Sequence, residues 1–179
     1  MIIDASVRKF GDDVDTDVII PARYLASRDP AVLGRHCMEP LDPHFADRVR
    51  PGDVIVAGRN FGCGSSREHA VLALKGVGVS CVIARGFARI FFRNALNQGL
   101  PVLTCPEVAD AAREGASIKV DLSAGEIELD GARFKAQPLP DFLRQVVASG
   151  GLTPYVRRRL AERSGGGGSS SSGGVSSAA

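Results

Sequence analysis

The residues best suited to chemistry lie together in one short segment, Asn60 to Ala70, which reads NFGCGSSREHA. Two glycines there are followed by two hydroxyls and a guanidinium, directly before a run whose spacing predicts a helix. Backbone N–H groups and the positive end of a helix dipole converge at such a junction and favour a bound anion. Ser66 and Arg67 are suitable partners for a carboxylate or a phosphate. The segment therefore predicts an anion-binding loop.

The spacing of this loop does not fit three familiar motifs. A Walker A loop needs a lysine after its last glycine, and Gly64 is followed by Ser65. A dinucleotide-binding fingerprint beginning at Gly62 needs a third glycine where Arg67 stands. A hydrolase nucleophile elbow centred on Ser65 needs glycines at the positions of Cys63 and Arg67. The sequence of the loop therefore matches none of these three motifs.

A purely structural role is the alternative for the same residues. Ser65 and Glu68 have the spacing of a capping box, so the alternative role of Ser65 is to cap the helix. The two glycines would then be present only because they allow tight backbone angles. Arg67 favours the anion site, because a guanidinium at a helix N-terminus opposes the dipole unless an anion joins it. His69 projects about 100° per residue away from its neighbours on a helix, which indicates a structural residue more than a base.

The elements around the loop alternate between buried strands and helices, which is typical of an α/β domain. A less regular strand is predicted at residues 5–10. Short apolar runs predict strands at 54–57, 81–84 and 102–103, and helical spacing predicts helices at about 70–76, 87–95 and 106–114. The anion-binding loop thus follows one buried strand and opens a helix.

Beyond residue 117 the pattern changes to an alternation of apolar and polar residues, as in antiparallel strands with one solvated face. Asp130-Gly131 between two such runs predicts a two-residue hairpin, and a last amphipathic helix is predicted from Leu139 to Val146. We expect residues 1–163 to form one domain. The Gly/Ser-rich tail, residues 164–179, is expected to be disordered.

The composition excludes several classes of partner. With 22 basic and 20 acidic residues the net charge is only +2, which predicts no nucleic-acid partner and no membrane partner. No apolar run approaches the roughly 20 residues that cross a bilayer. The four cysteines lack metal-site spacing, and the acids at 12–17 do not match a calcium loop, so no metal site is expected in this chain. Free thiols indicate a reducing, cytoplasmic location.

Taken in order, these motifs resemble the swivel domain of the aconitase superfamily. The matching stretches are residues 15–21, 62–70, 86–94 and 97–101, within a resemblance that runs from about Phe10 to Lys135. The resemblance implies one swivelling β/β/α domain of the α/β class, with parallel and antiparallel strands. A free-standing chain of this length is similar to the small subunits of the two-chain dehydratases in that superfamily.

The resemblance also implies a hydro-lyase reaction, in which a hydroxyl moves between adjacent carbons of a substituted malate. The substrate is then a small dicarboxylate, and the partner is a large subunit carrying a [4Fe-4S] cluster, with no cofactor bound by this chain. By the same resemblance Ser65 is the catalytic base, and Ser66 and Arg67 bind a substrate carboxylate. The residues implied to support them are Asp15, Thr16, Asp17, Asn60, Gly62, Gly64 and Glu68. The chain alone is expected to be inactive.

The resemblance assigns Tyr24, Leu25 and Ala26 to the substituent that differs between substrates. A neutral Ala26 suits the isopropyl group of isopropylmalate, whereas a cation there would suit the extra carboxylate of homoaconitate. Homoaconitate and 2,3-dimethylmalate remain open as alternative substrates, and ordinary packing remains open for Tyr24 and Leu25. A non-catalytic anion-binding module is the alternative from a different functional class.

Overall fold

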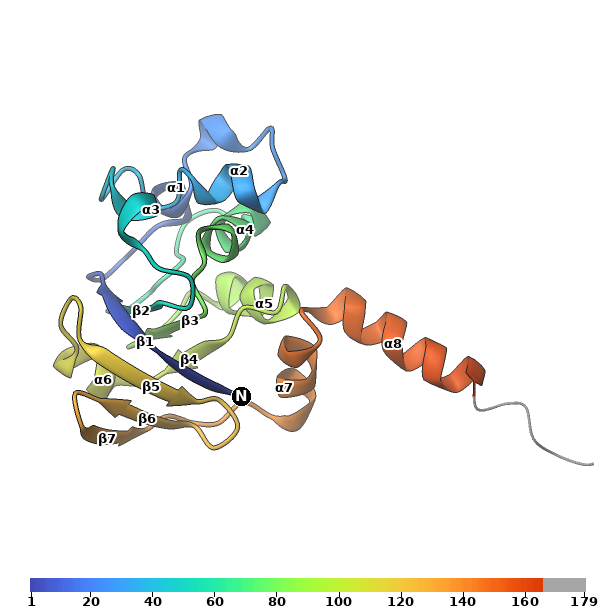
Figure 1. Cartoon of the computed structure of the whole chain (residues 1–179). Helices are drawn as coiled ribbons and strands as arrows, with labels where there is room; N and C mark the ends of the chain where they lie inside the picture. Colours follow the sequence, from blue (N-terminus) through green and yellow to red (C-terminus); the bar gives the residue numbers. More distant parts are fainter. Residues whose placement is uncertain (166–179) are drawn as a thin grey trace, which may run out of the picture.

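A single twisted sheet organises the chain, and Figure 1 shows it in the computed structural model, which describes residues 1–165. The seven strands lie in the order β4-β3-β2-β1-β5-β6-β7. Their bounds are β1 Ile2–Lys9, β2 Val54–Ala57, β3 Cys81–Ala84, β4 Val102–Thr104, β5 Ser117–Asp121, β6 Glu126–Leu129 and β7 Ala132–Lys135. Strands β1 to β4 pair in parallel, whereas β5, β6 and β7 continue the sheet from β1 in antiparallel pairing. The predicted α/β class with both kinds of pairing is confirmed.

The two parts of the sheet follow the two patterns in the sequence. Every residue of β2 and β3 is buried, because helices and loops cover both faces of the parallel part. In β5 and β6 buried and exposed residues alternate, as an antiparallel ribbon with one solvated face requires. Asp130-Gly131 connects β6 to β7, so the predicted hairpin is confirmed.

The helices are short and mostly follow the parallel strands. Their bounds are α1 Thr16–Ile19, the 3₁₀ helix η1 Ala22–Tyr24, α2 Pro30–Gly34, α3 Phe45–Arg48, α4 Glu68–Val77, α5 Arg89–Asn97, α6 Pro106–Ala111, α7 Asp141–Ala148 and α8 Leu152–Gly165. Helix α6 ends three residues before the predicted Glu114, because the chain becomes extended at Ala112. Among residues 1–165, no helix is both long and apolar enough to span a bilayer.

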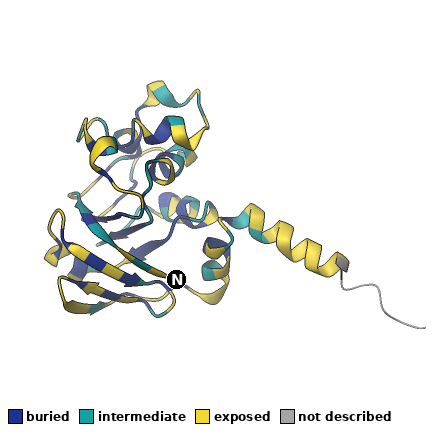
Figure 2. Cartoon of the chain, in the orientation of Figure 1, coloured by how far each residue is buried: buried dark blue, intermediate teal, exposed yellow. Residues whose placement is uncertain are grey.

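Helix α8 differs from the sequence prediction, which placed the last helix before Gly150. It extends away from the body of the molecule, and nearly all its side chains are exposed (Figures 1 and 2). Its polar residues are spread around the helix, so it lacks the apolar stripe that would have predicted it. The helix also crosses the predicted domain boundary at residue 163, and most of the predicted tail lies outside the described residues.

Candidate functional site

Three loops leave the carboxyl ends of β1, β2 and β3 and run side by side. The loop after β2 donates from Gly62 N to Val14 O in the loop after β1, at 2.8 Å, and Cys63 O accepts from Thr16 N at 2.8 Å. On its other side, Phe61 N donates to Gly86 O at 3.0 Å in the loop after β3. These bonds continue the parallel pairing beyond the strands, so the anion-binding loop is held between two neighbours.

The two glycines of this loop are required by close neighbours as well as by the backbone. Gly62 has φ +80°, and a Cβ there would lie 2.1 Å from Cγ of Phe91. Gly64 has φ +88°, and a Cβ there would lie 2.3 Å from a carboxylate oxygen of Asp15. Only glycine combines the left-handed backbone with this absence of a side chain. The loop is therefore tightly packed on α5 and on the β1 loop, just before the serines.

Ser65 and Ser66 are both exposed, and their loop is fixed from beneath. The hydroxyl of the buried Thr16 donates to the backbone carbonyl of Ser65 at 2.9 Å. Helix α4 begins at Glu68 with Arg67 as its N-cap and no side-chain cap, so the capping-box alternative for Ser65 is wrong. Glu68 instead accepts from Arg28 at 2.8 Å. Ser65 is therefore an exposed residue at the start of the helix whose side chain does not cap it.

The Arg67 side chain is only 18% exposed and forms an ion pair with Asp17. The contact to Asp17 is made by Nη1, which is buried. A guanidinium has five N–H donors, and this ion pair engages one of its nitrogens, so the others remain available to a bound carboxylate. Arg67 thus meets the requirement for an anion ligand beside the two serines.

These residues line one cavity of about 390 Å³. One wall is the β1 loop and the anion-binding loop, and the other is the beginning of α5. The lining residues are Thr16, Gly62, Gly64, Ser65, Ser66, Arg67, Ala88, Arg89, Ile90, Phe91 and Arg93. A cavity of this size, with hydroxyls and several guanidinium groups, suits a small dicarboxylate.

Arg89 and Arg93 were not predicted as site residues, although the stretch that contains them matches the superfamily. Both are exposed, and neither forms an ion pair among the described residues. The sequence did contain one signal for an anion-binding role of these residues. Two cations lie four residues apart at the start of a helix that has no acid in its first turn. The sequence could not show that this helix faces the serines.

Tyr24, Leu25 and Ala26 do not line this cavity. The Tyr24 hydroxyl donates to Glu39 at 3.0 Å, and its ring stacks on His36 with 3.8 Å between ring centroids. Leu25 packs against the core and Ala26 is exposed. The ion pair between Arg28 and Glu68 connects this segment to the start of α4, so the segment borders the site without contributing to the cavity.

The acids of the β1 loop have internal partners. Asp12 accepts from Arg59 N at 2.8 Å and Asp13 accepts from Asn60 Nδ2 at 3.0 Å. Asp15 caps α1 by accepting from Asp17 N at 2.7 Å. These acids and Asn60 support the loop and do not enter the cavity.

His69 is half-buried on the first turn of α4 and lies outside the residues that line the cavity. Its buried Nε2 lacks a hydrogen-bond partner in the described structure. No contact connects it to Ser65 among the described hydrogen bonds, which agrees with the prediction that it is not the base.

Among residues 1–165, no three His, Cys, Asp or Glu side chains lie close enough together to hold a metal. Cys37, Cys81 and Cys105 are buried free thiols, and burial raises the pKa of Cys81 to about 12. An iron–sulfur cluster needs several adjacent thiolates. The described residues of this chain therefore do not fit such a cluster.

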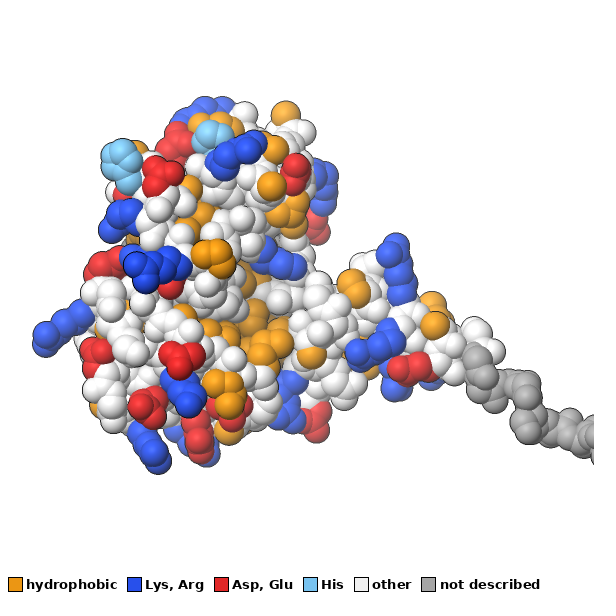
Figure 3. Space-filling model, in the orientation of Figure 1, with side chains coloured by type: hydrophobic (Ala, Val, Ile, Leu, Met, Phe, Trp, Pro, Cys, Tyr) orange, Lys and Arg blue, Asp and Glu red, His pale blue; other side chains and the backbone are white. Residues whose placement is uncertain are grey.

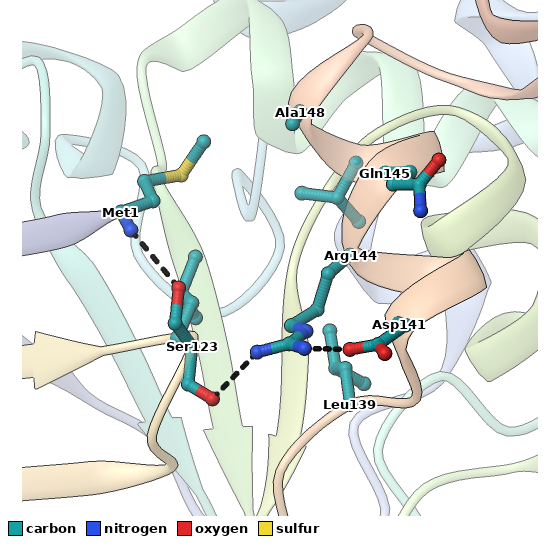
Figure 4. Close-up of a pocket in the computed structure, with 9 residues that line it drawn as sticks. Met1, Ser123, Leu139, Asp141, Arg144, Gln145 and Ala148 are labelled. Carbon is teal, nitrogen blue, oxygen red and sulfur yellow. Dashed lines mark hydrogen bonds and ion pairs between the residues drawn. The ribbon is translucent and has the colours of Figure 1, made fainter.

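A second cavity, of about 290 Å³, lies beside the start of β1 and helix α7 (Figure 4). Hydrophobic side chains gather in the hollow near these elements on the face shown in Figure 3. Arg144 there donates to the backbone carbonyl of Ser123 at 2.8 Å and forms an ion pair with Asp141. The Met1 amino group donates to Ser123 Oγ at 3.3 Å. The arginine of this cavity is therefore already paired, unlike Arg89 and Arg93 at the serine-lined one.

The fold and the serine-lined cavity together define an aconitase-type swivel domain, and a family model for the aconitase C-terminal domain matches residues 41–108. A 3-isopropylmalate dehydratase small subunit of Moorella thermoacetica is 52% identical over 89% of this chain and 98% of its own length. A small subunit 1 of the same enzyme from Methanopyrus kandleri is 56% identical over 83% of this chain and 89% of its own length.

A solved structure of 3-isopropylmalate dehydratase from Methanocaldococcus jannaschii superposes with a TM-score of 0.88 at 46% identity, covering 93% of this chain and all of that one. The chain belongs to the family of 3-isopropylmalate dehydratase small subunits.

Proposed function

We propose that this chain is the small subunit of a dehydratase that interconverts 2-isopropylmalate and 3-isopropylmalate, with Ser65 as the catalytic base. The names of its relatives support the reaction and the two-subunit assembly. The single observation that supports the role of Ser65 is its exposed position in a cavity that Ser66 and Arg67 also line. A large subunit is the expected partner, in the cytoplasm.

In the proposed reaction the Ser65 alkoxide removes a proton from one carbon, the C–O bond at the adjacent carbon breaks, and the departing hydroxyl takes up a proton from solvent to leave as water. Rehydration in the opposite sense returns the proton and places the hydroxyl on the other carbon. A serine hydroxyl is a weak base, so it needs positive potential to hold its charged form. Arg67 and the N-terminus of α4 have the required sign. A [4Fe-4S] cluster on the partner would supply Lewis-acid activation of the departing hydroxyl.

Ser66 and Arg67 are proposed to hold the carboxylate next to the carbon that loses its proton. The ion pair with Asp17 holds Nη1 of the Arg67 guanidinium, which leaves its other nitrogens for a carboxylate oxygen. Fixing the carboxylate in this way orients the reacting carbon toward Ser65 and also stabilises the charge that develops on it.

The choice of isopropylmalate over homoaconitate or 2,3-dimethylmalate rests on the relatives and on the neutral Ala26. Ala26 is exposed next to the segment tied to α4 by Arg28, so it can meet a substituent at the edge of the site. Turnover of the reconstituted pair on each of the three substrates separates these alternatives.

The decisive experiment replaces Ser65 with alanine and reconstitutes the chain with its large subunit. We expect turnover to fall by at least about a hundredfold, with assembly unchanged. Ser117→Ala on the exposed face of β5 is the matched control and should retain full turnover. Near-normal turnover by Ser65→Ala would show that Ser65 is not the catalytic base and would favour a non-catalytic anion-binding role for the loop.

A further inference from the structure

The beginning of α5 presents an exposed surface on the rim of the serine-lined cavity, formed by Arg89, Ile90 and Arg93; we call it the α5 rim. The two arginines lie one helical turn apart and are exposed. Ile90 lies next to Arg89 on the rim and is 53% exposed, which is high for a large apolar side chain. The rim thus combines two unpaired cations with an apolar contact.

This arrangement is unfavourable for α5 by itself. A cation in the first turn opposes the helix dipole, and like charges at i and i+4 repel. The helix has no acid in its first turn, and its N-cap, Ala88, provides no side-chain hydrogen bond. Within the described residues nothing neutralises either arginine. The charges of the α5 rim therefore suit a negative group that comes from outside the chain.

We infer that the α5 rim is a docking surface for an acidic segment of the large subunit, with an apolar side chain of that segment on Ile90. The inference rests on the proposed function, which requires the large subunit to approach this cavity. Charge complementarity selects an acidic partner. A second copy of this chain would bring the same cations face to face, which disfavours self-association through this rim.

The substrate is a less suitable occupant for the rim. Ser66 and Arg67 already provide one carboxylate site on one wall of the cavity, and Arg89 and Arg93 lie on the other wall, at the beginning of α5. With one carboxylate held by Ser66 and Arg67, the substrate has a single carboxylate left for two arginines, whereas a protein segment can cover Ile90 while its acids reach both cations.

The test measures the dissociation constant between this chain and its purified large subunit by titration calorimetry. We expect the double charge reversal Arg89→Glu with Arg93→Glu to raise the Kd at least about a hundredfold, and Ile90→Asp to raise it at least about tenfold. The binding of the unaltered chain should weaken as salt is added, and the double variant should lose most of that dependence.

A matched control has the same change in net charge at other sites. Arg113 and Arg133 are exposed and have no ion pair among the described residues, and Arg133 lies on β7 at the opposite edge of the sheet from β4. Arg113→Glu with Arg133→Glu should leave the Kd within about threefold of the unaltered value, because neither residue lines the serine-lined cavity.

Misfolding can be separated from lost docking. Arg89→Glu places an acid in the first turn of α5 and four residues before Arg93, and both changes favour the helix. This single variant should therefore raise the melting temperature of the isolated chain by about 1 to 3 °C while weakening partner binding. A more stable chain that binds less well cannot have lost binding through unfolding.

Two results would overturn the inference. One is an unchanged Kd in the double reversal; the other is a raised KM for isopropylmalate at an unchanged Kd, which would assign the arginines to the substrate. Ser65→Ala keeps this test independent of the proposed function. It should bind the large subunit with the unaltered Kd, so normal turnover by that variant would refute the catalytic role and leave the docking result intact.

Discussion

The parallel and antiparallel parts of the sheet differ in how their strands are connected. The connections after β1, β2 and β3 are long, and they leave the same edge of the sheet, where they form the cavity wall with α5. The antiparallel strands are joined by tight turns, such as Asp130-Gly131. Parallel strands need crossover connections, and these connections supply the loops that converge on a site.

Charge is also treated differently in the two parts. On the exposed face of the antiparallel strands, Lys119 lies opposite Glu128, which in turn lies opposite Arg133. Opposite charges in such cross-strand positions stabilise the ribbon. Each of these charges on the antiparallel strands thus has an opposite charge in register with it, whereas Arg89 and Arg93 at the serine-lined cavity have none among the described residues.

Two glycines with similar backbones sharpen this comparison and give the largest expected effect. Gly62→Ala adds a Cβ against Phe91 in a left-handed conformation, and should lower the free energy of unfolding by about 3 to 5 kcal/mol. Gly131→Ala in the hairpin also has positive φ but meets nothing within 4 Å, so about 1 to 2 kcal/mol is expected. Urea unfolding of both variants measures the difference. Equal losses would contradict the tight packing of the anion-binding loop.

Arginines in the two cavities give an intermediate effect. Arg67→Lys keeps the charge but removes the planar fork, and should lower kcat/KM of the reconstituted enzyme by about ten- to a hundredfold. Arg144→Lys in the second cavity changes a side chain already bound to Ser123 and Asp141, so kcat/KM should stay at the unaltered value. Steady-state kinetics distinguish them, and similar losses in both variants would mean that the cavities are not functionally distinct.

The smallest effect concerns the thiol in the anion-binding loop. Burial, followed by the nearby carboxylates of Asp15 and Asp13, raises the pKa of Cys63 above its ordinary value. A raised pKa keeps the thiol protonated at neutral pH, and the thiolate is the reactive form. Iodoacetamide should therefore label native Cys63 slowly at pH 7 and faster as the pH rises above 9, as followed by peptide mass spectrometry. Rapid labelling at pH 7 would contradict this.

The strands, the hairpin and the site loop could be predicted from the sequence, because each depends on a short pattern. Buried runs such as Cys81–Ala84 and the turn at Asp130-Gly131 need no distant contact to be recognised. The capping-box alternative was wrong because Glu68 finds Arg28, forty residues away, instead of the start of its own helix. Local spacing cannot reveal that competition.

Other features depend on how the elements come together. Arg89 and Arg93 join the site only because α5 packs against Gly62, which brings the end of one loop to the start of another helix. Helix α8 was missed because its exposed residues carry no apolar period, so the usual signal for a helix is absent. The roles assigned to Ser65, Ser66 and Tyr24 through Ala26 stay predictions until the variants are measured.

Thr16 also fixes the neighbouring anion-binding loop. Its backbone amide donates to the carbonyl of Cys63, and its hydroxyl donates to the carbonyl of Ser65. A single residue of the chain after β1 therefore binds the anion-binding loop on both sides of Gly64. The alignment of β1 and β2 therefore determines where the backbone of the proposed base lies. These bonds hold the backbone of the loop within a single chain, so we expect the binding of a large subunit to leave the loop as it is.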